Sequence, residues 1–380
     1  MKDEVINVGI IGGSLNNQWA SKTHIPVLIE NPSYRITAIG TSKMETAKKS
    51  AIKVNANSAF TDHKELAKSK DVDLVVVSIK VPLHYEACIA AIEENKHLYC
   101  EWPLGVDTVQ AKKLADLANQ ANIHHAIGLQ ARQSPEVNYL KQAIEKGEIG
   151  KVLSCTMQVA TQSKGRITDQ SSAYLLKKEN GANLLTIHGG HSLDVLCYIL
   201  GDFKELTATM NINYTEAIIN ETGTKTPKNT ADQILIHGTL VDGTSASVHI
   251  QAGVYPDFNL EIRGEKGIFR LTQNNSSGHV QFGNLKVEKI THPNYASLNT
   301  ETDDVYSEEV KVSSVKDGGP ARYVEHAYNI LAKDIFEHRR QIPNFNDAVK
   351  LHQLLDAVRG SAKRGKKIVL NFGCQEATQF

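Results

Sequence analysis

The stretch Val5-Ile6-Asn7-Val8-Gly9-Ile10-Ile11-Gly12-Gly13 decides the fold of this 380-residue chain. Its β-branched run is typical of a buried strand, and the glycine pair that ends it indicates a tight turn. Further along, Asp73-Leu74-Val75-Val76-Val77-Ser78-Ile79 is the clearest buried strand in the chain. The segments around these two runs indicate the kind of sheet to which they belong.

The N-terminal part of the chain alternates short apolar runs with helical patterns of about 10–15 residues, as in a parallel, doubly wound sheet. Strands are expected at 5–11, 34–40, 73–79, 96–100 and 124–129, and helices at 18–31, 43–54, 85–95 and 108–121. We therefore predict an α/β architecture that begins with a Rossmann domain over residues 1–130.

The pattern changes after about residue 150, where short strand-like segments follow one another closely. They lie at 151–160, 205–213, 233–240, 245–251, 260–263 and 268–271, with glycine turns between several of them. This pattern predicts an antiparallel meander, and hence an α+β domain over residues 131–380. Helices expected at 321–339 and 346–364 could pack back on the first domain. The polar stretches 215–230 and 294–319 are expected to be long loops.

Composition excludes several classes of protein. Acidic and basic residues balance at 42 each, which argues against direct nucleic-acid binding. No apolar run approaches the roughly 20 residues that span a bilayer, and residues 1–4 show no signal-peptide pattern. The cysteines are scattered, without the spacing of a disulfide framework or a zinc site: Cys88, Cys100, Cys155, Cys197 and Cys374. We expect a cytoplasmic protein with reduced thiols, no bound metal and no membrane contact.

The turn after the first strand has the features of a pyrophosphate site. In Gly12-Gly13-Ser14-Leu15-Asn16, a glycine turn leads into an expected helix, whose N-terminus favours negative charge. The G-x-G-x-x-G fingerprint is degenerate, because Ser14 replaces the second glycine and Asn17 the third. A glycine turn without a ligand is the alternative, but the surrounding β–α–β pattern favours the binding site.

The end of the second expected strand indicates which dinucleotide binds. NAD sites usually have a carboxylate there for the ribose 2′-hydroxyl, whereas this chain has Thr41-Ser42-Lys43. Two hydroxyl groups and an ammonium suit a 2′-phosphate. We therefore predict NADP(H) as the preferred cofactor, with NAD(H) as the second candidate. Ser42 also fits a helix N-cap, and both roles can hold together.

Residues 73–104 carry a family resemblance. The strand at 73–79, then His84-Tyr85-Glu86 and then 95–104 (NKHLYCEWPL) resemble the glucose–fructose oxidoreductase and inositol dehydrogenase (Gfo/Idh/MocA) superfamily. Further matches follow in order at 147–152, 191–194, 262–267 and 361–365. The resemblance implies a small-molecule substrate and a homo-oligomer formed through the antiparallel sheet. It also implies cofactor contacts at Ile79, Lys80, His84, Glu101 and Trp102.

The chain departs from this family at two positions. The resemblance implies a lysine near the nicotinamide where this chain has Trp102, and an aspartate where it has Ile187. The histidine of the second motif is retained as His191. Neither an indole nor an isoleucine can shuttle a proton. Within the superfamily this pattern is most similar to the branch that contains the inhibitor of the yeast galactose regulon, which regulates and does not catalyse.

A few side chains remain as candidates for binding and chemistry. His191 is the candidate catalytic base, with a core histidine as the alternative. Lys80 is a candidate replacement for the missing ammonium, with a solvated loop lysine as the alternative. Arg132 and His188 are candidate substrate contacts, and a surface salt bridge is the alternative for Arg132. Trp102 either stacks on the nicotinamide or anchors the proline that follows it.

These observations favour an NADP(H)-dependent oxidoreductase that acts on a sugar- or polyol-like substrate, with His191, aided by Lys80, handling the proton. The rival hypothesis is a non-catalytic, NADP-binding regulatory protein that binds a protein partner. Trp102 and Ile187 favour the regulator. The retained His191 and the family resemblance favour the enzyme.

Overall fold

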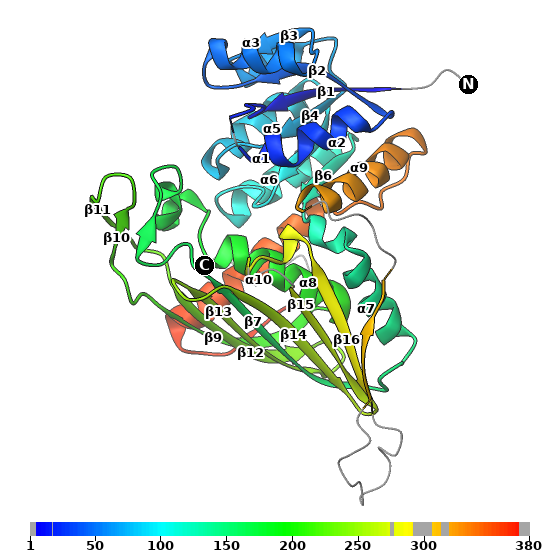
Figure 1. Cartoon of the computed structure of the whole chain (residues 1–380), viewed down its shortest axis with the longest axis vertical. Coiled ribbons are helices and arrows are strands. Elements are labelled where there is room, and N and C mark those ends of the chain that lie inside the picture. The colour runs from blue at the N-terminus through cyan, green and yellow to red at the C-terminus, as the bar shows by residue number, and fades with distance from the viewer. Residues whose placement is uncertain (1–4, 17, 274–276, 292–305, 313–318, 372–380) are drawn as a thin grey trace, which may run out of the picture.

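The computed structural model describes residues 5–16, 18–273, 277–291, 306–312 and 319–371. Figure 1 shows one sheet with its helices at one end of the molecule and a larger sheet with its helices at the other. The sequence predictions that concern Asn17, Cys374 and much of 294–319 lie outside the described residues. No helix in the described ranges has the length and apolar character to cross a bilayer.

The first sheet has six strands, all paired in parallel, in the order β3-β2-β1-β4-β5-β6. They are β1 Ile6–Ile11, β2 Tyr34–Gly40, β3 Ser58–Phe60, β4 Leu74–Val77, β5 His97–Glu101 and β6 His125–Gly128. The predicted doubly wound Rossmann sheet is confirmed. The strand order reverses between β1 and β4, where open sheets of this kind bind ligands at their carboxyl edge. The short strand β3 was not predicted, because three half-buried residues form no apolar run.

Helices connect these strands, and the two faces of the sheet belong to separate apolar clusters. The helices are α1 Trp19–Lys22, α2 His24–Glu30, α3 Met44–Lys53, α4 His63–Lys68, α5 His84–Glu93 and α6 Thr108–Gln120. Val75 and Val77 face one cluster, whereas Leu74 and Val76 face the other. The single helix predicted at 18–31 is wrong, because it breaks between α1 and α2. Pro26 cannot donate a hydrogen bond to the turn before it, and its ring clashes with a continuing helix.

The second sheet has nine strands, in the order β17-β16-β15-β14-β7-β13-β12-β9-β18. Their bounds are β7 Val152–Thr161, β9 Phe203–Asn211, β12 Gln233–Leu240, β13 Ser245–Ala252, β14 Asp257–Gly264, β15 Gly267–Gln273, β16 Leu285–Thr291, β17 Tyr306–Val310 and β18 Ile368–Val369. The sheet is largely antiparallel, but the prediction of a simple meander is wrong. Strand β7 lies between β13 and β14 and pairs in parallel with β13. A register set by long-range pairing leaves no mark on local sequence patterns.

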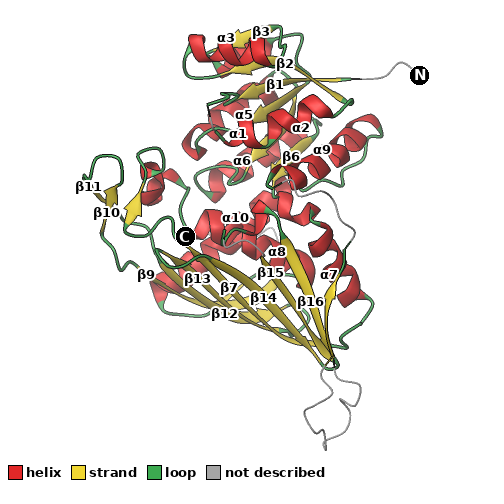
Figure 2. Cartoon of the chain, in the orientation of Figure 1, coloured by secondary structure: helices red, strands yellow, loops and turns green. Residues whose placement is uncertain are grey.

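Four longer helices complete the fold: α7 Pro135–Glu145, α8 Gly190–Leu200, α9 Ala321–Phe336 and α10 Phe345–Arg364. Helix α9 lies beside α2 at the first sheet (Figure 2), where the Tyr328 hydroxyl bonds His24 and the Tyr328 carbonyl oxygen accepts from Tyr34. Helix α10 packs between α6 and β9. The last part of the chain therefore ties the two sheets together.

The stretches predicted as long loops contain strands. Within 215–230, β10 Glu216–Ile219 and β11 Lys225–Pro227 form a small sheet with β8 Ile167–Thr168. Within 294–319, β17 pairs with β16. These strands were missed because they are short, with three to five residues each, and too brief for a pattern of apolar and polar residues to stand out from a loop.

Candidate functional site

The glycine turn after β1 leaves no room for a side chain. Gly12 has a φ of +91°, and a Cβ there would lie 2.1 Å from the Ser78 carbonyl oxygen. The amides of Gly12 and Gly13 both donate to the Gly40 carbonyl oxygen, at 2.9 and 3.1 Å. The turn is therefore held tightly between β2 and β4, at the point where the strand order reverses. This is the close-packed cradle that a dinucleotide pyrophosphate requires.

Some of the polar groups that follow this turn form hydrogen bonds within the chain. The Leu15 amide donates to the Ser50 hydroxyl, and the Asn16 amide donates to the Ser14 hydroxyl. Ser14 and Leu15 are half-buried, and Asn16 is exposed. These polar groups lie at the carboxyl edge of the sheet, as the sequence predicted.

The segment after β2 does not begin a helix as predicted. The N-cap of α3 is Lys43, with no side-chain capping bond, so the predicted N-cap role of Ser42 is wrong. The Thr41 hydroxyl instead donates to the Lys43 carbonyl oxygen at 2.8 Å and closes a turn. Helix α3 therefore begins one residue later than predicted. The side chains of Ser42 and Lys43 are exposed. Both can meet a ligand at this edge.

His84 joins the loops after β4 and β5. Its ring nitrogens lie 3.0 Å from the Ile79 carbonyl oxygen and 2.8 Å from the Pro103 carbonyl oxygen. Burial lowers the pKa of His84, against the opposing effect of these two carbonyls. The neutral ring donates to one of these carbonyls and packs against the other, so His84 links the two loops and reaches a cofactor only through them.

Glu101 and Trp102 both point into the protein. A Glu101 carboxylate oxygen lies 3.0 Å from His24 Nε2 in a buried pair. Trp102 is 5% exposed, and its Nε1 donates to the Thr186 carbonyl oxygen at 2.7 Å. A Cβ on Gly190 would lie 2.5 Å from that nitrogen. This packing favours an anchoring role for Trp102, because the indole edge is committed to the second domain.

Opposite Trp102, the second domain presents a cluster of buried titratable side chains, called here the histidine–lysine cluster: Lys164, His188, His191 and His279. His188 belongs to a π-helical turn, η5 Leu185–Gly189, that leads directly into α8, where His191 stands. The His279 ring centroid lies 4.3 Å from that of His188 and 5.2 Å from that of His191. π-Helical turns are rare and often occur at functional sites.

The cluster is buried, and one ring nitrogen of each of its histidines is not satisfied. Nδ1 of each of His188, His191 and His279 is buried without a hydrogen-bond partner among the described residues. Such atoms are costly to leave unpaired, and they mark places where an ordered water or a ligand completes the network. Burial lowers the pKa of His191 to about 3 and places those of His188 and His279 well below their ordinary value. All three imidazoles are therefore neutral near pH 7.

A row of rings connects the cluster to the glycine turn. Phe282, in η6 Val280–Phe282, stacks on His279 with centroids 4.6 Å apart. Trp19, the first residue of α1, lies 5.8 Å from Phe282. Together with Trp102 against Gly190, these contacts place the histidine–lysine cluster between the two domains, next to the carboxyl edge of the Rossmann sheet.

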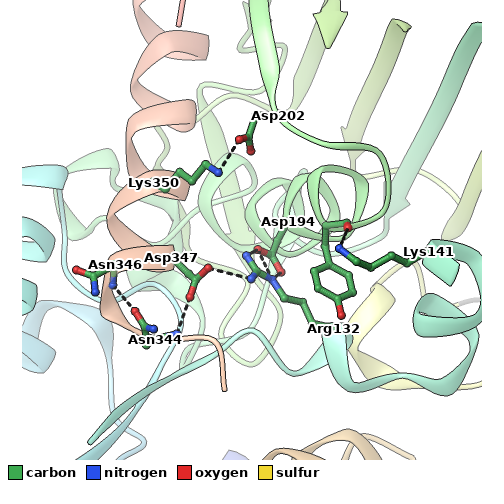
Figure 3. A network of polar contacts seen from close by, with 9 residues as sticks. Arg132, Lys141, Asp194, Asp202, Asn344, Asn346, Asp347 and Lys350 are labelled. Carbon is green, nitrogen blue, oxygen red and sulfur yellow. Dashed lines mark hydrogen bonds and ion pairs between the residues drawn. The ribbon is translucent and has the colours of Figure 1, made fainter. Parts of the chain in front are cut away.

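Lys80 and Arg132 contact residues outside this cluster. Lys80 is exposed, and its ammonium sits 4.8 Å from the centroid of Tyr174 in η3 Ala173–Leu176. Arg132, in η2 Gln130–Gln133, donates to both carboxylate oxygens of Asp194 and, at 3.0 Å, to Asp347 (Figure 3). The predicted alternative for Arg132, a salt bridge, is present, but the pair is largely buried and not at the surface.

The Arg132 pair lines a cavity of about 210 Å³ between α7, α8 and α10. Its charged lining is balanced, because three cations, Arg132, Lys141 and Lys350, face three carboxylates, Asp194, Asp202 and Asp347 (Figure 3). No member of the histidine–lysine cluster lines this cavity. The described residues contain no group of acidic, cysteine and histidine side chains suited to a metal ion.

The sequence analysis missed two members of the cluster. Lys164 lies in the polar segment Gln162-Ser163-Lys164-Gly165 after β7, and His279 immediately precedes η6. Neither lies in a motif or at a distinctive spacing from His191. Only the folded chain brings them together, so no local signal could have identified them.

A glycine turn at the switch point of a parallel sheet, faced by a second domain with a mostly antiparallel sheet, defines a dinucleotide-binding protein of the Rossmann class. Residues 6–128 match the oxidoreductase family with an NAD-binding Rossmann fold, and residues 135–273 match the family of the Gal80p C-terminal domain. The first domain therefore matches the Gfo/Idh/MocA family and the second matches the Gal80p family, which agrees with the resemblance seen in the sequence.

Its relatives include both enzymes and regulators. The chain is 28% identical to the dehydrogenase aclE of Aspergillus oryzae over 376 residues, which cover 95% of this chain and 97% of that protein. It is 29% identical to the galactose/lactose metabolism regulatory protein GAL80 of Saccharomyces cerevisiae over 304 residues, 74% of this chain and 69% of that protein. A structure of levoglucosan dehydrogenase with NADH and L-sorbose shares the fold, with a TM-score of 0.82, 21% identity and coverage of 96% and 99% of the two chains.

Proposed function

We propose that this protein is an NADP(H)-dependent oxidoreductase that interconverts an alcohol and a carbonyl on a sugar- or polyol-like substrate. The observation that carries the proposal is the histidine–lysine cluster at the edge of the Rossmann sheet. Four titratable side chains are buried there, and Nδ1 of each of the three histidines has no hydrogen-bond partner among the described residues. A protein that only sensed a dinucleotide would have no need for them, since burying unsatisfied polar groups costs stability.

The residues at the edge of the sheet fit a nicotinamide dinucleotide. Gly12 and Gly13 provide the side-chain-free turn for the pyrophosphate, and Ser42 and Lys43 are exposed where a 2′-phosphate would lie. The loops that His84 fixes, including Ile79 and Trp102, would border the nicotinamide. When bound, the dinucleotide supplies the hydride chemistry that no side chain can.

The neutral histidines suit substrate binding better than proton transfer. With a pKa near 3, His191 is a weak base near pH 7, and His188 is in the same position. Each neutral ring can donate one hydrogen bond and accept another, which suits a polyhydroxylated ligand. We therefore assign His188 and His191 to orienting the substrate hydroxyls.

The cofactor proposal is tested by measuring the affinities of the purified chain for NADPH and NADH. We expect NADPH to bind roughly tenfold or more tightly, the equivalent of one charge-assisted hydrogen bond to the 2′-phosphate. Lys43→Met should remove most of this preference, whereas Lys48→Met, an exposed lysine further along α3, should keep it. Tighter binding of NADH would contradict the preference.

The catalytic proposal is tested by following NADPH absorbance with a panel of hexoses, ketohexoses, polyols and anhydrosugars. Turnover with any member, reduced strongly by His191→Ala, would support it. Tight NADPH binding without turnover across the panel would instead favour the second candidate, a non-catalytic regulator. That candidate draws on Trp102, whose indole N–H is committed to Thr186, and on the match of residues 135–273 to the Gal80p domain.

The outer face of the nine-stranded sheet is proposed to pair with a second copy of the chain. Leu153 on β7 and Leu235 on β12 are about half exposed on this sheet, at 50% and 43%. Light scattering should give a mass of two chains or more. Leu235→Lys should shift the protein toward the monomer, because it places an unpaired charge in the contact. A monomeric native chain at micromolar concentration would overturn this assignment.

A further inference from the structure

We propose that Lys164 is the acid–base group of this protein, and that its ammonium meets the reacting oxygen of the substrate in place of the lysine that is absent at position 102. This inference rests on the proposed oxidoreductase function and assigns its proton chemistry. Three features of the fold carry it: the burial of Lys164, its lack of an ion pair, and its position near His188 and His279.

Lys164 is buried without a counter-charge. Its side chain follows β7, is 8% exposed as a residue, and makes one hydrogen bond, from Nζ to the Ser163 hydroxyl at 3.2 Å. It forms no ion pair with any carboxylate of the described residues, and the neighbouring Asp169 is exposed. Buried ammonium groups are almost always paired, so an unpaired one indicates a role other than stability.

The backbone at Lys164 adds a second indication. Its φ is +63°, in the left-handed region that glycine and asparagine normally occupy. The next residue, Gly165, packs against Gly253, where a Cβ on Gly165 would lie 2.3 Å from the Gly253 Cα. The backbone of Lys164 is therefore in an unfavourable conformation, and the packing of Gly165 on Gly253 holds it there. Strain of this kind concentrates at functional sites.

The other candidates for proton transfer are less suitable. Lys80 is exposed and lies against Tyr174. The histidines of the cluster bind protons too weakly near pH 7. Packing places Lys164 near His279, because Gly278 lies against the Ala160 carbonyl oxygen near the end of β7, four residues before Lys164. Consistent with this position, the positive charge of Lys164 contributes to the lowered pKa values of His188 and His279.

Burial lowers the pKa of Lys164 to about 8, against a smaller opposing effect of Asp169. A group with this pKa can both give and take a proton near neutral pH, which is what reversible oxidation of an alcohol requires. The charged and titratable groups that face it are His188, His279 and Asp169, and the two histidines stay neutral. The protonation of Lys164 therefore does not compete with that of the two histidines.

In the reducing direction, Nζ of Lys164 gives one proton to the carbonyl oxygen, and the hydride for the carbonyl carbon would come from a bound reduced dinucleotide. The C–O double bond becomes a single bond, and the alcohol, the oxidised dinucleotide and a neutral amine result. Solvent then returns a proton to the amine. The oxidising direction is the reverse, in which the neutral amine takes the hydroxyl proton.

The first test needs no turnover. Competitive labelling of the native chain with trace acetic anhydride, read by mass spectrometry across a pH series, gives the pKa of each lysine amine. We expect the reactivity of Lys164 to rise through its lowered pKa of about 8, with the exposed Lys177 as the control for labelling. An amine at Lys164 that stays unreactive at every pH would overturn the inference, because such an amine could not meet a substrate.

The second test uses the substrate on which the wild-type chain turns over best. Lys164→Met should lower kcat by about 100-fold or more with little change in the affinity for NADPH, and Lys177→Met should leave kcat unchanged. Added methylamine should restore part of the turnover of Lys164→Ala, and larger amines less. Lys164→Arg should not restore it, because a guanidinium does not lose its proton in this range.

The possible failures are distinguishable. Full turnover in Lys164→Met would overturn the role of Lys164 and leave the proposed oxidoreductase intact. A loss of turnover that no amine restores, together with an ordinary pKa for Lys164, would show a structural role only. A wild-type chain that binds NADPH and turns over nothing would refute the proposed function itself, and the inference with it.

Discussion

Two buried lysines in the second domain have opposite surroundings. Lys228, before β12, is 4% exposed, and its Nζ donates to the Thr230 carbonyl oxygen at 2.6 Å and to Asp232 at 3.1 Å. Asp232 in turn accepts from the backbone amides of Asn213 and Tyr214. Lys164 is comparably buried but has only a serine hydroxyl. The paired charge of Lys228 stabilises the fold, whereas the unpaired charge of Lys164 destabilises it and is consistent with a functional role.

Arg132 belongs with Lys228 in this comparison. Burial would lower its pKa, but the charges of Asp194 and Asp347 outweigh burial and raise it. Each arm of its guanidinium is used (Figure 3). Buried ions that are fully paired stabilise the folded chain relative to a broken pair, whereas unpaired ones destabilise it. The comparison therefore predicts opposite signs for equivalent substitutions.

The largest effect is expected at Lys228. Lys228→Met leaves the Asp232 carboxylate buried without its counter-ion and should lower the free energy of unfolding by about 3–5 kcal/mol. Urea unfolding measures this. The matched control is Lys225→Met, an exposed lysine paired with Glu216, which should change stability by less than about 0.5 kcal/mol. Equal losses of stability at Lys228 and Lys225 would show that the buried ion pair of Lys228 is no more stabilising than an exposed one.

Arg132→Met should cost somewhat less, roughly 2–3 kcal/mol, because its side chain and that of Asp347 keep some contact with solvent. The change strands Asp194, which is almost fully buried. Adding Asp194→Asn to the variant should recover part of the loss, since the amide carries no charge. A double variant less stable than the sum of the two single changes would show that the ion pair is not what stabilises this region.

Lys164→Met should have the opposite sign and raise the free energy of unfolding by about 1–3 kcal/mol near pH 7. The pKa of Lys164 falls from 10.5 to about 8 on folding. Below pH 8 the folded chain carries the whole penalty of the buried charge, and the penalty fades as the pH rises from 8 to 10.5. The gain in the variant should therefore shrink at pH 10. A variant that unfolds more easily at neutral pH would contradict an unpaired ammonium.

Near neutral pH the smallest effect is expected at His191, because its effect develops only in acid. The pKa of His191 is about 3 in the folded chain and ordinarily 6.5, so its contribution to stability is complete above 6.5 and is lost as the pH falls toward 3. His191→Gln should make the free energy of unfolding fall less steeply with decreasing pH in this window. The change in slope corresponds to at most one bound proton. His188 and His279 should maintain the remaining decline. An unchanged slope in the variant would mean that His191 is not buried as a neutral ring.

The edge of the Rossmann sheet was predictable from local pattern. Gly12 and Gly13 follow a β-branched run, and Ser42 and Lys43 follow the next strand. In a parallel sheet both ends must meet at one edge, so the sequence order determines the neighbours. The error at Ser42 is a shift of one residue in the helix start, because the Thr41 turn delays α3.

The roles of individual side chains were less predictable. Trp102 was expected to stack on a cofactor or to anchor its proline, but its N–H bonds a carbonyl of the second domain. Arg132 was expected at a ligand or in a surface pair, but lies in a largely buried ion-pair network. Both outcomes depend on which residues of distant segments lie opposite, and nothing in the neighbouring sequence carries that information.

The sequence by itself determined the two-domain architecture, the parallel sheet, the glycine turn and the family. These depend on the periodicity of apolar residues and on turn chemistry, which act over a few residues along the chain. Only the tertiary structure decided the order of the nine-stranded sheet and the assembly of Lys164, His188, His191 and His279. Their burial and their mutual distances arise from packing between segments far apart in sequence, and burial is what sets the charge state of each group.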